Sequence, residues 1–165
     1  MQIMRFLRHL FTTRWSLNRA FDAETRHAIE QAITETEKSH RGELRFAVEA
    51  DLGIWALLGG ETAAERSLDM FADLGVWDTE DNSGILIYVL LADHHVAIVA
   101  DRGYRDHVSN EQWREICARM ESAFREGDFR KGAVEGVLGA ARYAAEFFPL
   151  DGENPNELPN EMVFL

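Results

Sequence analysis

The sequence predicts an α/β protein: a three-layer α/β/α sandwich with a small mixed β-sheet that contains one β-hairpin and carries helices on both faces. Residues 85–91 are continuously apolar, which is typical of a strand buried on both of its faces. Residues 92–95 then reverse the chain, and residues 96–100 return antiparallel to that strand. Residues 43–49 alternate between polar and apolar side chains, and a helical pattern joins them to residue 85. This crossover makes the first two strands parallel, so the sheet is mixed.

The first 21 residues form a basic amphipathic segment. Residues 1–19 contain four arginines and no acid, so they carry +4 while the remainder carries −16, which gives the net charge of −12. Apolar residues recur at helical spacing from Ile3 to Phe11. We expect the segment to be retained, because no apolar run has signal-peptide character or approaches the roughly 20 residues of a membrane span. Two interpretations stay open: residues 1–15 dock on their own domain, or they contact a membrane surface or a partner.

The remaining helices are predicted from apolar residues at spacings of three and four, with a capping residue before the pattern and glycine or proline after it. They cover residues 22–39, 61–74, 109–126 and 129–148. Residues 51–60 are less regular and predict a loop or a short helix.

Length and composition predict one domain, because 165 residues with 46% apolar content can build a single core. The chain divides into the basic segment 1–21, a domain 22–148 and an extended acidic tail 149–165. With 29 acidic against 17 basic residues, a general nucleic-acid binder is excluded. The single cysteine, Cys117, excludes an internal disulfide and is expected to be a buried, inert thiol. We therefore expect the protein in the cytoplasm or at the membrane periphery.

Acidic side chains gather before the second strand and after the third, and they are candidate ligands for Ca²⁺ or Mg²⁺, which prefer hard oxygen donors. The candidates are Asp78, Glu80, Asp81 and Asp101. The stretch does not match a calcium-binding EF-hand loop, because Ser83 and Val89 stand where glycine and glutamate are needed. The alternative interpretation is a solvated turn.

A second group of charges lies on the polar face of the first strand and near it. It comprises Glu43, Arg45 and Glu49 on the strand, Arg66 on the next helix, and Asp101 and Arg102 after the third strand. Charges in a helix-covered sheet are costly unless they are paired, so something must satisfy them. Either they pair among themselves, or Arg66, Asn82 and Arg102 bind a phosphate or carboxylate. In the second case Asp101, Arg102, Glu43 and Arg45 are the candidate catalytic residues, in one shared pocket.

Other chemistries lack support in the sequence. His94 and His95 are expected in the hairpin turn, where adjacent side chains point to opposite faces and do not share a metal. No nucleophile elbow, Walker loop, dinucleotide fingerprint or zinc-binding helix is present, so we expect neither covalent catalysis nor an organic cofactor.

Several short motifs occur in a characteristic order: Leu74-Gly75, then Asn82-Ser83-Gly84, then Asp101-Arg102-Gly103, then Gly127-Asp128-Phe129. Over residues 22–148 this order resembles the TPM domain family, in its short, stand-alone bacterial type. The resemblance implies an α/β/α sandwich. It also implies two activities: a divalent-cation-linked acid phosphatase, credited to plastid members, and assistance to membrane proteins.

From the residues and the resemblance together we expect an accessory module, with or without a bound Ca²⁺ or Mg²⁺. This module is expected to bind an unknown protein partner through the strand-end face and to assist a membrane protein or its assembly. The alternative is a divalent-cation-dependent phosphatase that acts on small phosphomonoesters. The sequence leaves open whether the protein is an enzyme.

Overall fold

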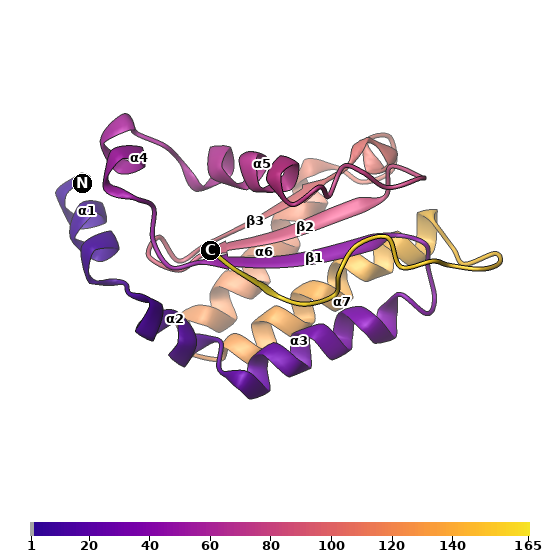
Figure 1. Ribbon diagram of the computed structural model, residues 1–165, viewed down its shortest axis with the longest axis horizontal. Coiled ribbons are helices and arrows are strands. Elements are labelled where there is room, and N and C mark those ends of the chain that lie inside the picture. Colours follow the sequence, from indigo (N-terminus) through magenta and orange to yellow (C-terminus); the bar gives the residue numbers. More distant parts are fainter. Residues whose placement is uncertain (1) are drawn as a thin grey trace.

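The computed structural model describes residues 2–165, apart from the side chains of Gln2, Ile3 and Ile54, and it confirms the predicted fold class. A mixed sheet lies between two layers of helices (Figure 1). Its strands are β1 (Glu43–Glu49), β2 (Gly84–Leu90), β3 (His95–Ala100) and β4 (Val163–Phe164), in the order β3-β2-β1-β4. Strand β1 pairs parallel with β2 and with β4, and β2 pairs antiparallel with β3. The predicted position Ile3 lies outside the described side chains.

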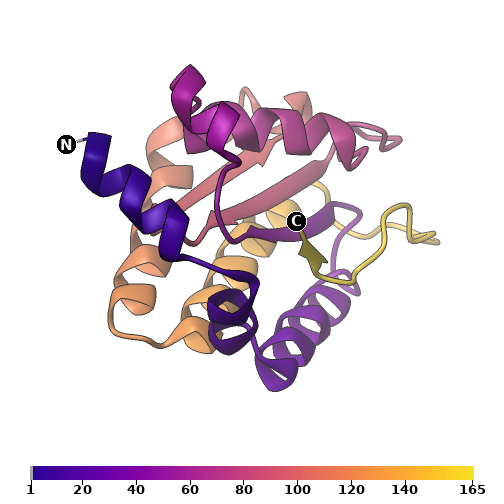
Figure 2. The same cartoon turned by 60° about the vertical axis from the view of Figure 1, so that its left-hand side comes forward.

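Helices cover both faces of the sheet (Figures 1 and 2). They are α1 (Gln2–Phe11), α2 (Arg14–Ala20), α3 (Ala23–Thr36), α4 (Ile54–Gly59), α5 (Ala63–Asp73), α6 (Asn110–Arg125) and α7 (Phe129–Phe147), with a 3₁₀ turn, η1, at Arg102–Tyr104. Side chains of α2, α3, α6 and α7 form the larger apolar core with one face of the sheet. Helices α4 and α5 form a smaller core with the other face.

The alternation of β1 distributes its side chains as the sequence predicts. Leu44, Phe46 and Val48 belong to the larger core, whereas Ala47 belongs to the smaller one. The charged residues of the strand therefore face the side of the sheet that carries α5 and the C-terminal tail. This orientation places the polar face of β1 beneath those two segments.

The tail adds a strand that the sequence did not predict. Residues Val163–Phe164 pair with Ala47 and Val48, and the Leu165 N–H donates to the Val48 carbonyl at 3.0 Å. A two-residue strand leaves no local periodicity, because its conformation is set by the strand beside it. The tail consequently closes the β1 edge of the sheet, and β3 forms the opposite edge.

Candidate functional site

At the end of β1, the polar face of the strand carries an ion pair between Glu49 and Arg66, and a tyrosine hydroxyl also donates to this pair. Arg66 on α5 donates from Nε and Nη2 to the two carboxylate oxygens of Glu49, each at 2.9 Å. The Tyr88 hydroxyl on β2 donates to Oε2 of the same carboxylate at 2.6 Å. Burial, together with this hydrogen bond, raises the pKa of Tyr88. The bond to Glu49 likewise raises the pKa of Arg66. Glu49, Arg66 and Tyr88 thus form one hydrogen-bonded cluster.

Glu43 and Arg45 are buried beneath the C-terminal tail. The Glu43 carboxylate accepts the backbone N–H of Glu157 at 3.3 Å and of Leu158 at 3.1 Å. Arg45 Nη1 donates to the carbonyl oxygen of Pro159. Burial raises the pKa of Glu43 and lowers the pKa of Arg45. The tail thus gives both charges backbone partners and leaves Arg45 Nε buried without one, and both side chains are shielded from solvent.

Glu37, which sequence analysis did not single out, lies buried beside Glu43. Burial raises the pKa of Glu37 to about 7, and the like charge of Glu43 adds to the effect. The backbone N–H of Leu44 donates to Glu37 Oε1 at 3.4 Å, which partly offsets it. Its position at the end of α3 gave no signal, because the burial comes from a tail that is distant in sequence.

Glu37 should make stability fall as the pH rises. Its pKa in the folded state, about 7, lies above its ordinary value of 4.5, so the folded chain keeps a proton that the unfolded chain releases. This contribution is complete below pH 4.5 and is lost between pH 4.5 and about 7. Glu37→Gln should remove this pH dependence, which amounts to on the order of 3 kcal/mol in the free energy of unfolding between the two pH values. Urea unfolding at a series of pH values measures it.

The matched control is Glu35→Gln, an exposed position on the same helix whose carboxylate pairs with Lys38 at the surface. It should leave the pH dependence unchanged, because exposed pairs contribute little. A difference between wild type and Glu37→Gln that stays constant with pH would contradict the assignment.

The loops at the end of β3 and before β2 contain a second group of paired charges. Arg41 contacts Asp81 at 3.1 Å and Asp151 at 3.4 Å. Arg102 Nε donates to Asn82 Oδ1 at 2.7 Å. Asp101 Oδ1 accepts the Arg102 backbone N–H at 2.6 Å and caps η1. Three of the predicted site residues are therefore joined through Arg102, which contacts both Asn82 and Asp101.

The shared pocket expected between the two groups of charges is not formed by direct contacts. Asp101 donates its backbone N–H to Gly84, the residue that pairs with Glu43 in the sheet, so both groups lie at the same end of the sheet. Within residues 2–165, however, no hydrogen bond or ion pair joins Asp101 or Arg102 to Glu43 or Arg45. Each group has partners among its own neighbours, although Arg45 Nε and Asp101 Oδ2 are buried without a hydrogen-bond partner.

The predicted metal ligands do not gather into one cluster. In the part of the chain that the structure describes, no three His, Cys, Asp or Glu side chains are arranged to hold a metal ion. Asp81 contacts Arg41, and Asp78 and Glu80 are exposed. Of the four, Asp101 is the one with a buried carboxylate oxygen, Oδ2, that has no hydrogen-bond partner among the described residues.

The two histidines of the hairpin occupy different structural positions. His94 occupies the turn with a φ of 52°, and His95 begins β3 with its Nδ1 at 3.2 Å from Glu121 Oε1.

The structure reveals a groove of about 830 Å³ along the edge strand β3. Helix α5 forms one wall with Ala64 and Leu68, and α6 forms the other with Arg114 and Ala118. No sequence pattern predicts this groove, because its lining comes from three separate elements.

Two comparisons with known proteins decide the family. The family model of the TPM domain matches residues 17–143. The chain belongs to the TPM domain family. This TPM domain is similar to the NMR structure of BA42 protein from the psychrophilic bacterium Bizionia argentinensis sp. nov., with 30% sequence identity and a TM-score of 0.71. The similarity covers 86% of this chain and 93% of that one. A search of curated protein sequences gave no match.

Proposed function

We propose that this TPM domain is an accessory module that binds an extended segment of a partner protein along β3. The observation that carries the proposal is the groove of about 830 Å³, which follows an edge strand between two helices. Extended peptides bind such edges by adding a strand, with backbone hydrogen bonds for affinity and side-chain pockets for specificity.

The edge of β3 offers backbone groups that β2 does not use. The Val96 N–H points away from β2, because it donates to Glu121 Oε1 on α6 at 3.0 Å. By the two-residue period of the strand, the N–H groups of Ile98 and Ala100 point the same way. A bound strand would replace the Glu121 contact and the contact of the Ile98 backbone with Cys117, and it would pair with this row. Leu68, 59% exposed on the wall of the groove, would contact its side chains.

The charged residues support binding over hydrolysis. Glu43, Arg45 and Glu49 each have partners within the chain, which favours a structural role for their side chains. A partner protein is therefore better accommodated at the groove than at the strand ends.

Site-specific photo-cross-linking tests this proposal. A photoreactive amino acid at Leu68 or Ala118, on opposite walls of the groove, should give the same discrete adduct in cells of the source organism. The matched control is Gln31, an exposed residue in the groove between α3 and α7, which should not give that adduct. Adducts that are equal at all three positions, or absent at both groove positions, would contradict it.

A second candidate function is divalent-cation binding, favoured by the buried and unpartnered Oδ2 of Asp101. A carboxylate oxygen is a ligand that Ca²⁺ and Mg²⁺ prefer, and water would have to complete the coordination. Either ion should then raise the unfolding temperature of the wild type but not of Asp101→Asn.

Phosphatase activity would appear as chelator-sensitive hydrolysis of p-nitrophenyl phosphate above a buffer blank. That result would replace the accessory role with an enzymatic one, acting on small phosphomonoesters.

A further inference from the structure

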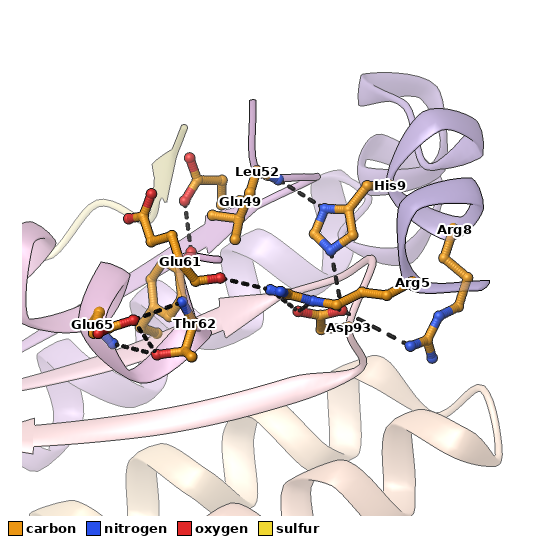
Figure 3. Close-up of polar contacts among 10 residues, drawn as sticks. Arg5, Arg8, His9, Glu49, Leu52, Glu61, Thr62, Glu65 and Asp93 are labelled. Atoms are coloured by element: carbon orange, nitrogen blue, oxygen red, sulfur yellow. Dashed lines mark hydrogen bonds and ion pairs between the residues drawn. The ribbon is translucent and has the colours of Figure 1, made fainter. Parts of the chain in front are cut away.

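Helix α1 docks on the domain through its polar side. Arg5 Nη2 lies 2.8 Å from Asp93 Oδ2, and Arg5 Nε also donates to this carboxylate (Figure 3). The Arg5 guanidinium reaches further, to the backbone carbonyl of Glu61 at 3.0 Å. These contacts join the helix to the β2–β3 turn and to the start of α5.

His9 fixes the orientation of the helix. Its Nδ1 accepts the backbone N–H of Leu52 at 3.0 Å, so the ring proton is on Nε2, which donates to Asp93 Oδ1 at 3.0 Å (Figure 3). The side chain is buried, with 1% exposed. A histidine held on both nitrogens prevents rotation of the helix about its axis.

This orientation turns the apolar side of α1 outward. Met4, Leu10 and Phe11 are 67%, 61% and 74% exposed, although a helix docked for its own burial would place such residues inside. Trp15, in the next helix α2, is 69% exposed. The contacts with Asp93 thus hold an apolar surface in solvent, which marks it as a surface for binding.

Helix α4 extends this surface. It lies beside α1 at the same end of the molecule (Figures 1 and 2), and Phe6, Leu10 and Leu57 line one pocket between the two helices. Trp55 and Leu58 on α4 are 83% and 67% exposed. No charged residue occurs between Leu52 and Gly60. We call α1, α2 and α4 together the N-terminal surface.

Charge identifies the occupant of the N-terminal surface. Arg8, Arg14 and Arg19 are exposed there, and the first nineteen residues contain no acid, whereas the rest of the chain carries −16. An anionic lipid surface attracts such arginines, accepts the apolar side chains below its headgroups, and suits tryptophan at the boundary. No helix among the described residues is long and apolar enough to cross a bilayer.

We propose that the N-terminal surface binds an anionic membrane, with Met4, Leu10 and Phe11 inserted among the headgroups. The acidic remainder of the domain would face away from the lipid, because like charges repel. The proposal goes beyond the groove beside β3 and does not depend on it.

Flotation of the full chain with lipid vesicles tests the proposal. The protein should float with vesicles of phosphatidylcholine and phosphatidylglycerol. Leu10→Asn with Phe11→Asn should lower the partition coefficient at least tenfold, because two apolar side chains that the lipid would bury are lost. Leu138→Asn with Leu150→Asn, two exposed leucines elsewhere, should leave it unchanged. Matched thermal unfolding of all variants excludes loss of the fold.

A charge variant tests the lipid class. Arg14→Gln with Arg19→Gln should lower binding to the anionic vesicles by about thirtyfold, since each basic residue contributes about 1 kcal/mol. Equal binding to pure phosphatidylcholine would overturn the anionic part of the proposal. Absence of flotation would overturn it entirely, as would a dimer in solution that Leu10→Asn with Phe11→Asn dissociates, which would assign the surface to a second copy.

Discussion

Replacing Gly84 with alanine is expected to lower the free energy of unfolding by about 4 kcal/mol, which would be exceptional for adding one methyl group. Gly84 is buried at the start of β2, and a Cβ there would overlap the carbonyl oxygen of Val76 and lie 2.9 Å from its Cγ1. The obstruction is backbone, which cannot rotate away as a side chain can. The motif that carries the family resemblance therefore requires this glycine for packing. Urea unfolding measures the cost.

Two other glycines serve as matched controls. A Cβ at Gly136 in α7 would meet Met120, whose Cε and Cγ would lie at 2.7 and 2.9 Å, but that flexible side chain can move. Gly136→Ala should cost no more than about 1 kcal/mol. Gly59→Ala meets nothing within 4 Å and should be neutral or stabilise by about 0.5 kcal/mol. A Gly84→Ala protein as stable as Gly136→Ala would show that the Val76 loop yields.

Local patterns predicted the elements that depend on local physics. The apolar run of β2, the alternation of β1 and the Asp22 cap, which accepts the Thr25 N–H at 2.8 Å, each arise from neighbouring residues. Strand β4 and the docking of α1 through Arg5 do not arise from neighbouring residues. Both are decided by partners about a hundred residues away, which no periodicity encodes.

The candidate site shows the same division. Burial of Glu43 and Arg45 in a covered sheet predicted that both charges need partners. The partners are backbone groups of the tail, 114 or 115 positions along the chain, and so could not be identified from the sequence. The direct contacts expected between the two groups of charges are also absent from residues 2–165, where each group is paired with neighbours of its own.

Arg66→Met is expected to destabilise the protein by about 3 kcal/mol, because it leaves the Glu49 carboxylate nearly buried with only the Tyr88 hydroxyl as a partner. Methionine keeps the length and apolar stem of the side chain, so the loss reports the charge rather than packing. For a domain of this size the unfolding temperature should fall by roughly 6 to 12 °C.

The double variant Glu49→Met with Arg66→Met distinguishes a structural cluster from a functional one. Replacing both charges removes the uncompensated carboxylate, and buried ion pairs exchanged for apolar residues are often neutral in stability. We expect the double variant to recover at least half of the stability that Arg66→Met loses, with the rest reflecting the unpartnered Tyr88 hydroxyl. If the double variant is as unstable as the single one, the cluster stabilises the protein through packing geometry. The charges of Glu49 and Arg66 would then be available to bind a ligand. Recovery would instead assign Glu49 and Arg66 to holding α5 against the sheet, beside the groove that the partner is proposed to occupy.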